Sequence, residues 1–296
     1  MKLEFKNLPP AQRQNWLQHA IAPRPICFAS TIDKAGHVNL SPFSFFNLFS
    51  SNPPIVVFSP ARRVRDNTTK HTLENVLEVP EIVINIVDYD MVQQVSLSSC
   101  EYPKGVDEFI MSGFTPVASE SIKPPRVVES KVQMECRVIE VKPLGLEGGA
   151  GNLVICEVLI MHIADDILNA EGNMIDQKKI HHVARLGGDW YCKVDEKNLF
   201  HVAKPKHQLG IGFAQLPEEI RHSKVLTGNQ LAQLANEEIL PVAEASFYDP
   251  HVKEIIQYFS PNPDEMELEL HRHAAHLLDQ GKVKEAWQVL LVTTFI

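Results

Sequence analysis

The sequence predicts a mainly β protein with helices, in which a closed or partly closed antiparallel β-barrel precedes a helical C-terminal region. Two observations indicate the barrel: short strand patterns follow one another through residues 26–87, and two longer strand patterns flank a glycine-rich loop. Strand patterns seldom alternate with helix patterns, which argues against a doubly wound sheet. At 296 residues, the chain is long enough for about two domains.

Three short strand patterns open the predicted barrel. Residues 26–32 form the first pattern and residues 37–43 form the second, and the segment between them ends at Gly36, which can adopt a positive φ. This turn chemistry predicts that the two strands form a hairpin. A third strand is predicted at 55–58, after two prolines that favour extended backbone.

The next part of the chain mixes helix and strand patterns. Helical character at residues 72–78 ends before Pro80, and the β-branched run at 81–87 is typical of a strand buried on both faces. A helix is predicted at 88–100. Residues 101–126 contain four prolines, so we expect an irregular surface excursion there.

Two long strands are predicted on either side of a flexible loop at 145–152, which contains four glycines. The strand at 127–141 alternates apolar and polar residues, and the strand at 153–163 returns beside it. The alternation places four residues of the first strand on one face: Val132, Met134, Cys136 and Val138.

Beyond residue 197 the strand patterns give way to helical ones. Helices are predicted within 216–239 and 264–291, and the second is interrupted at Gly281. Thr227 or Asn229 is a candidate N-cap, because either side chain can accept backbone N–H bonds at the start of a helix.

Composition and charge restrict the classes of function. Hydrophobic residues make up 44% of the chain and charged residues 22%, as in an ordinary globular protein. Lysine and arginine number 28 against 37 aspartates and glutamates, which gives a formal net charge of −9. We do not expect so acidic a chain to bind nucleic acid or an anionic membrane. No apolar stretch approaches the ~18 residues of a membrane span and no signal-peptide core opens the chain, so we expect a cytoplasmic protein.

Neither the cysteines nor the histidines indicate a disulfide framework or a metal site. The five cysteines form no Cys-x-x-Cys pair. Three lie in apolar strand patterns and are interpreted as buried packing residues rather than nucleophiles: Cys27, Cys136 and Cys156. The densest group of histidines is His271, His273 and His276. Their spacing spreads them over more than one face of a helix, which favours a solvated surface over zinc ligation.

The common nucleotide and hydrolase motifs are absent, including Gly-x-Gly-x-x-Gly, the Walker loop, Gly-x-Ser-x-Gly and His-Glu-x-x-His. The most distinctive segment is a basic bend at residues 59–72, which contains three arginines, a lysine, a histidine and several hydroxyl groups. It lies between a predicted strand and a predicted helix. Free N–H groups at a helix start, threonine hydroxyls and guanidinium donors together can bind phosphate. The alternative is a solvated basic loop.

A second distinctive segment, residues 39–47, combines aromatic and small hydroxyl side chains where a strand end runs into a turn. Extended backbone at this point can present N–H and C=O groups to a flat heteroaromatic ring, with phenylalanine side chains around the ring. The alternative is that these phenylalanines pack in the core.

Taken together, these segments resemble the flavin reductase-like family of the FMN-binding split barrel, and its flavoredoxin-type branch in particular. The resemblance covers residues 20–195 and rests on the order and spacing of short motifs: Pro23-Arg24-Pro25-Ile26, Ser30-Thr31, Gly36, the segment 39–47, Pro53-Pro54, Lys70-His71-Thr72 with Asn75, Val83-Ile84-Asn85-Ile86, and Arg185-Leu186-Gly187-Gly188 ahead of Tyr191. His71 is a departure, since the family often has Lys-Asp-Thr at this motif.

The resemblance implies a flavin reductase-like FMN-binding split barrel at residues 1–196 and a helical C-terminal extension at 197–296. It also implies a homodimer with FMN at the subunit interface. The isoalloxazine ring and ribityl chain would contact Ser41, Pro42, Phe43, Ser44, Phe46 and Asn47. The phosphate would be held by residues of the basic bend: Ser59, Arg62, Arg63, Asn67, Thr68, Thr69, Lys70 and His71. His182 and Tyr191 are candidates to border the open face of the ring, with a structural role as the alternative for His182.

FMN would supply the redox chemistry, so the chain needs no acid–base dyad, and no catalytic residue is assigned. The leading hypothesis is an FMN-dependent oxidoreductase, either an NAD(P)H-dependent flavin reductase or a relative of one. A non-enzymatic FMN-carrying electron-transfer protein is the main alternative, and a split-barrel interaction protein without flavin is the third. The sequence contains no nicotinamide fingerprint, so it does not distinguish NADH from NADPH.

Overall fold

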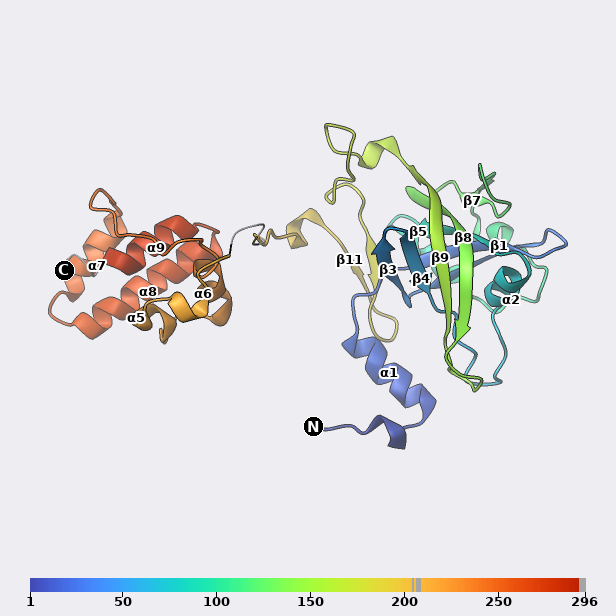
Figure 1. The fold of residues 1–296 in the computed structure, drawn as a ribbon, viewed down its shortest axis with the longest axis horizontal. Helices are drawn as coiled ribbons and strands as arrows, with labels where there is room; N and C mark the ends of the chain where they lie inside the picture. Colours follow the sequence, from blue (N-terminus) through green and yellow to red (C-terminus); the bar gives the residue numbers. More distant parts are fainter. Residues whose placement is uncertain (204, 206–208, 293–296) are drawn as a thin grey trace. The chain divides into compact units, whose positions relative to one another are not determined.

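The computed structural model describes residues 1–203, 205 and 209–292, and the chain divides into two compact units, Met1–Phe200 and His201–Ile296 (Figure 1). Each unit has a hydrophobic core of its own. The boundary that the sequence predicts after residue 196 falls in a short 3₁₀ helix, Glu196–Asn198, just before this division.

Seven strands of the first unit form one antiparallel sheet in the order β2-β1-β5-β8-β9-β4-β3 (Figure 1). Their bounds are β1 (Cys27–Ile32), β2 (Val38–Phe43), β3 (Phe46–Ser51), β4 (Pro54–Phe58), β5 (Glu81–Ile86), β8 (Val132–Pro143) and β9 (Asn152–Ile163). The hairpin predicted around Gly36 is confirmed, because β1 pairs with β2 and Gly36 has a φ of +89°.

The order of the strands requires the sheet to curl into a barrel. β2 and β3 are the two outermost strands, yet only Ser44 and Phe45 separate them in the chain. Three Cα–Cα steps can span at most about 11 Å, so the two edges of the sheet must lie close together at this point. The short connection therefore places the end of β2 beside the start of β3. We call the line along which these two edges of the sheet meet the seam.

Two strand boundaries differ from those that the sequence predicts. Residues 46–51 form strand β3, where the sequence indicates only a turn after residue 43. As an edge strand, β3 leaves most of its residues exposed or half-exposed, so it lacks the apolar alternation that reveals a strand. The strand predicted from residue 127 begins at Val132. The residues before it form β7 (Arg126–Val127), which pairs with β6 (Pro116–Val117).

The barrel interior is filled by apolar side chains of the inner strands and of α2 (His71–Glu78), which contributes Leu73 and Val76. The three cysteines predicted to be packing residues are buried there: Cys27, Cys136 and Cys156. Burial raises the pKa of the Cys136 thiol to about 12, so the group stays protonated and apolar at neutral pH. Val132 packs in a separate small cluster with Ile167 and Ile180, rather than with Met134, Cys136 and Val138.

Two short helices, α3 (Val92–Leu97) and α4 (Glu108–Ser112), pack against β2. α1 (Pro10–Ala20) precedes β1 in the chain, and none of its residues is buried. The helix predicted at 88–100 is shortened to α3, because Asp88 forms a β-bridge with His182 and its carboxylate accepts the N–H of Asp90 in a turn. The excursion after α3 is irregular as predicted, apart from α4 and the two-residue strands β6 and β7.

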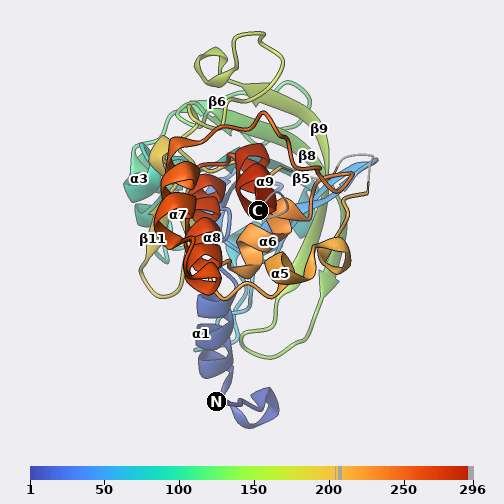
Figure 2. The same ribbon diagram turned by 90° about the vertical axis from the view of Figure 1, so that its left-hand side faces the viewer.

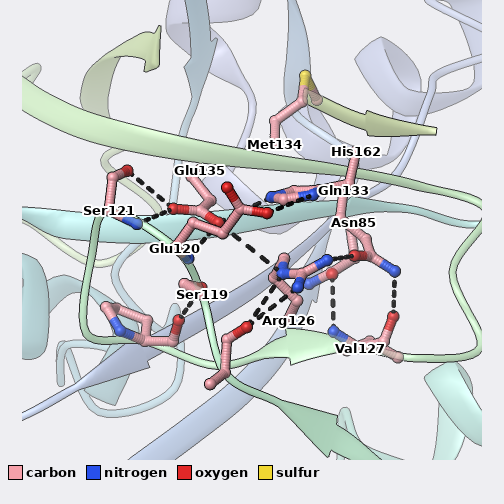
Figure 3. A network of polar contacts seen from close by, with 12 residues as sticks. Asn85, Ser119, Glu120, Ser121, Arg126, Val127, Gln133, Met134, Glu135 and His162 are labelled. Carbon is pink, nitrogen blue, oxygen red and sulfur yellow. Dashed lines mark hydrogen bonds and ion pairs between the residues drawn. The ribbon is translucent and has the colours of Figure 1, made fainter. Parts of the chain in front are cut away.

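A buried polar network attaches this excursion to the barrel (Figure 3). Glu135 of β8 is fully buried, and its carboxylate accepts the N–H groups of Glu120 and Ser121 at 2.8 Å each. The hydroxyl of Ser121 donates to the same carboxylate at 2.8 Å, and Nε2 of His162 lies 2.8 Å from Oε1. Burial alone would raise the pKa of Glu135, but these contacts lower it to about 2. Arg126 adds a longer ion pair at 3.8 Å.

The second unit is helical and consists of α5 (Glu218–Arg221), α6 (Gly228–Leu234), α7 (Pro250–Phe259), α8 (Pro263–Asp279) and α9 (Val283–Leu291). α8 packs against both α7 and α9 (Figure 2), and Trp287 of α9 is buried in the shared core. The predicted interruption is confirmed at Gly281, whose φ is +74°. Thr227 is the N-cap of α6 in a capping box with Gln230. In the described part of the chain, no helix has the length and apolar character needed to cross a membrane.

Candidate functional site

A cleft of about 400 Å³, measured out to its open mouth, lies beside the basic bend. Six of the candidate residues line it: Ser41, Pro42, Phe43, Arg63, Lys70 and His71. The first three belong to β2, whereas Lys70 and His71 lie at the start of α2. The cleft thus brings the aromatic segment and the basic bend, which are separate in the sequence, to a single site.

Arg63 faces the cleft and is held by backbone and hydroxyl oxygens of its own bend. Its Nη1 donates to Thr68 Oγ1 at 2.9 Å and to the carbonyl of Thr69 at 2.5 Å. Its Nε donates to Glu101 Oε1 at 3.2 Å. Only 17% of the Arg63 side chain is exposed. The guanidinium group is therefore fixed in place and partly desolvated, which strengthens its interaction with an anion.

Arg62, its neighbour, does not line the cleft. Its Nε and Nη2 donate to the side-chain oxygen and the carbonyl of Asn67, both at 2.6 Å. Asn67 has a φ of +57° and donates from its amide to the carbonyl of Leu146 at 3.0 Å. Arg62 and Asn67 therefore shape the bend and attach it to the loop between β8 and β9, instead of facing the cleft themselves.

Lys70 is the cation of the cleft without a partner. Its side chain is half-buried, and no acceptor or carboxylate among the residues that the structure describes lies within bonding distance of its ammonium group. Burial lowers the pKa of Lys70, and the positive charge of Arg63 lowers it further. An anion bound between Lys70 and Arg63 would relieve both effects, because it would pair with both cations.

The remaining candidates lie around the cleft without lining it. Thr68 donates to Asp66 Oδ1 at 2.6 Å, and Thr69 donates to Glu74 Oε1 at 2.6 Å. The N–H of Ser59 donates to the carbonyl of Phe45 at 2.8 Å, which joins the start of the bend to the seam of the barrel. Three further candidates occupy the turn after β2 and the start of β3: Ser44, Phe46 and Asn47.

Sequence reasoning missed the acidic side of the cleft. Glu101 and Glu108 both line it, together with Asn39, Ser99, Cys100 and Tyr102. Glu108 is buried and accepts the N–H of Leu40 at 3.0 Å, and burial raises its pKa. No local pattern marks these residues, because they reach the cleft only when the excursion folds back onto β2.

A second groove, of about 900 Å³ out to its open mouth, lies between α3 and the hairpin of β10 (Val183–Arg185) and β11 (Tyr191–Lys193). Each of two cations lies over a tyrosine ring in it. Lys193 Nζ is 4.3 Å from the ring centre of Tyr89, and Arg185 Cζ is 4.7 Å from that of Tyr191. His182 is not part of this groove; it is half-buried, and burial lowers its pKa.

The histidines of α8 have separate partners. His271 Nδ1 lies 2.7 Å from Ser223 Oγ, and His273 Nε2 lies 2.8 Å from Asp249 Oδ2. Within residues 1–203, 205 and 209–292, no group of three or more histidine, cysteine or acidic side chains is arranged to hold a metal ion.

The fold and the site together define a class of protein: an antiparallel split barrel with a cleft, lined by Arg63 and Lys70, beside the seam where its edge strands meet. A family model described as "Flavin reductase like domain" matches residues 19–182. The chain belongs to this family. The match lies within the barrel unit, so the helical unit is outside it.

The chain is also similar to individual proteins. An uncharacterized protein of Halalkalibacterium halodurans is 37% identical over 198 residues, which are 66% of this chain and 93% of that protein. The crystal structure of nitrilotriacetate monooxygenase component B from Bacillus cereus has a TM-score of 0.63 at 28% identity, covering 68% of this chain and 98% of that one. Flavoredoxin of Desulfovibrio vulgaris (Miyazaki F) shares the fold, with a TM-score of 0.51 at 22% identity, covering 62% of this chain and 91% of that one.

Proposed function

We propose that the chain binds FMN in the cleft beside the basic bend and acts as an oxidoreductase, with NAD(P)H as the electron donor. The observation that carries the proposal is the pair formed by Arg63 and Lys70. Both line the cleft, and among the described residues no carboxylate lies within ion-pair distance of Lys70, on which the charge of Glu101 acts only from farther away. A terminal phosphate would supply the missing negative charge and accept hydrogen bonds from both cations.

The other predicted residues fit the rest of FMN. Extended backbone at Ser41 and Pro42 lines the cleft, and the ring of Phe43 packs on Phe58 at a centroid distance of 5.3 Å, which leaves that wall rigid. Ser44, Phe46 and Asn47 continue along the seam, where the ribityl chain and the flavin ring would lie. Arg62 and Asn67 would act indirectly by holding the shape of the bend.

When bound, FMN supplies the hydride and electron transfer chemistry. The chain's own residues bind and orient it: Arg63 and Lys70 neutralise the phosphate, and the wall formed by β2 fixes the plane available to the ring. The groove between α3 and the β10–β11 hairpin is our candidate for the nicotinamide nucleotide. Lys193 and Arg185 would contact its phosphates, and Tyr89 offers a ring surface for stacking.

We further propose a homodimer with FMN at its interface. Leu48 and Phe49 of edge strand β3 support this, because they are 66% and 67% exposed and lie beside the seam. Burying such side chains against a second copy would remove apolar surface from water. Light scattering should show a dimer, and Phe49→Lys should shift the protein toward monomer.

The test of FMN binding is a calorimetric titration of the full chain with FMN and with riboflavin, which lacks the phosphate. Arg63→Ala and Lys70→Met should each weaken FMN binding at least about ten-fold, or about 1.4 kcal/mol, and leave riboflavin binding unchanged. Equal affinity of the wild type for FMN and riboflavin, or no FMN binding at all, would contradict the proposal. Arg62→Ala is the matched control, and it should weaken FMN less than Arg63→Ala does.

A second measurement separates an enzyme from an electron carrier. We expect NADH or NADPH to bleach the absorbance of the flavin-loaded protein, with repeated turnover when free flavin or another acceptor is present. Retained FMN that neither nucleotide reduces would favour the flavoredoxin-like alternative, in which a protein donor supplies the electrons.

A further inference from the structure

The cleft contains an acidic side chain in contact with the arginine that we assign to phosphate binding. Glu101 and Arg63 both line the cleft, and Arg63 Nε donates to Glu101 Oε1 at 3.2 Å. The other carboxylate oxygen accepts a hydrogen bond from Arg65 Nη2 at 2.8 Å. One carboxylate therefore joins two guanidinium groups of the basic bend.

This contact uses donors that a phosphate would need. Carboxylates and phosphates bind guanidinium groups through the same charge-assisted N–H···O bonds. Arg63 Nη1 is already bonded to Thr68 and Thr69, and Nε is bonded to Glu101. Of the three nitrogens, only Nη2 has no partner within the described residues. Nη2 alone can still donate to a phosphate, but the side-on pair of bonds through Nε and Nη2 can form only after Glu101 has moved away.

Glu101 is charged at neutral pH and can be displaced at little structural cost. The hydrogen bond from Arg65 is the largest effect that lowers the pKa of Glu101, and nearby Arg63 lowers it further. The side chain is 47% exposed and lies outside the helices and strands, between α3 and α4. Moving it breaks no backbone hydrogen bond of a regular element.

We propose that Glu101 is an internal anion that competes with the ligand phosphate for Arg63, and so determines how tightly the cleft holds flavin phosphate. The inference rests on the proposed function and extends it. In the free protein Glu101 occupies the arginine, and in the complex the phosphate replaces it. The competition lowers the affinity for FMN without affecting riboflavin, which favours an exchangeable flavin over a permanently bound one.

Two variants distinguish the effect of the Glu101 contact with Arg63 from the effect of its negative charge. Glu101→Gln removes the negative charge, and Glu101→Asp keeps it on a shorter side chain that cannot join Arg63 and Arg65 together. We expect FMN affinity to rise at least five-fold in Glu101→Gln and to rise less in Glu101→Asp, with slower FMN dissociation in both. Riboflavin affinity should stay at the wild-type value. Glu78→Gln, at the far end of α2, is the control for a general change in charge.

The outcomes distinguish this inference from the proposed function. Wild-type protein that binds FMN with the same or higher affinity than Glu101→Gln would overturn the competition and leave the flavin site intact. An equal rise of FMN affinity in Glu78→Gln would also overturn the competition, because the loss of a distant negative charge would then be sufficient to explain the tighter binding. Absence of FMN binding by the wild type and by both Glu101 variants would overturn the proposed function and the competition together. Thermal unfolding of each variant checks that the barrel is folded.

Discussion

The carboxylate of Glu135 and the imidazole of His162 meet across two neighbouring strands of the barrel, with Glu135 Oε1 2.8 Å from His162 Nε2. This pair lies at the centre of the network in Figure 3, through which β8 and β9 hold the excursion at Glu120 and Ser121. The network therefore stabilises the fold by holding the excursion against the barrel.

Glu135→Gln should therefore destabilise the barrel unit by about 3 kcal/mol, because the buried N–H groups and His162 lose their charged acceptor. Urea-induced unfolding at pH 7 measures the effect. Glu157→Gln is the matched control, since Glu157 forms a more exposed pair with Arg137 on the same two strands and should cost less than about 1 kcal/mol. Equal losses in the two variants would contradict the assignment.

The protonation of Glu135 should also determine the pH below which the barrel loses stability. The pKa of Glu135 is lowered from 4.5 to about 2 in the folded protein, so the unfolded chain takes up the proton first as the pH falls. The stability that this group contributes is complete above pH 4.5 and is lost between pH 4.5 and about 2. We expect the wild type to lose more stability than Glu135→Gln over this interval. Parallel pH dependences would show that Glu135 does not determine that pH.

Gly151 lies in the loop between β8 and β9, and we predict that a larger residue there affects FMN binding in the cleft. A Cβ atom at this position would lie 2.5 Å from Ser59 Oγ, so Gly151→Ala must displace the hydroxyl of Ser59 at the start of the basic bend. We expect a loss of about 1–2 kcal/mol in stability and several-fold weaker FMN binding. The double variant Gly151→Ala with Ser59→Ala removes the clash and should regain the stability. If the hydroxyl of Ser59 contacts the phosphate, the double variant will not regain FMN affinity.

The groove of Tyr89 and Lys193 predicts a change in nicotinamide binding that leaves the flavin site unaffected. Lys193→Ala removes the ammonium group that lies 4.3 Å from the Tyr89 ring and should raise the KM for NADH or NADPH several-fold at unchanged kcat. FMN affinity should not change. Lys178→Ala provides the control, because Lys178 pairs with Glu196 and does not line the groove. An unchanged KM in Lys193→Ala would exclude the groove as the nucleotide site.

The capping box of α6 predicts an effect confined to the helical unit. Thr227→Ala removes the acceptor for the N–H of Gln230 and should cost this unit about 1 kcal/mol, and Thr227→Ser should restore most of it. Calorimetry that resolves the two units should show only the helical transition shifting. A shift of the barrel transition by the same amount would contradict independent folding of the two units.

Local signals in the sequence were sufficient for several features. Thr227 and Gly281 mark helix boundaries through their own hydrogen-bonding and backbone properties, and both predictions are confirmed. The hairpin around Gly36 follows from turn chemistry in the same way. The basic bend was also visible, because its cations are close together in the chain. Each of these features depends only on a few consecutive residues of the sequence.

The tertiary structure decided which of those residues share a site. Arg62 and Arg63 are equivalent in the sequence, but Arg62 bonds to Asn67 and only Arg63 faces the cleft. Glu101 reaches Arg63 from 38 positions away, and Glu108 reaches Leu40 from 68 positions away. Such contacts form because the sheet closes on itself and the excursion folds over β2. Residue types and spacing therefore determined the barrel pattern and the positive charge, whereas long-range packing decided which donors remain available to a ligand.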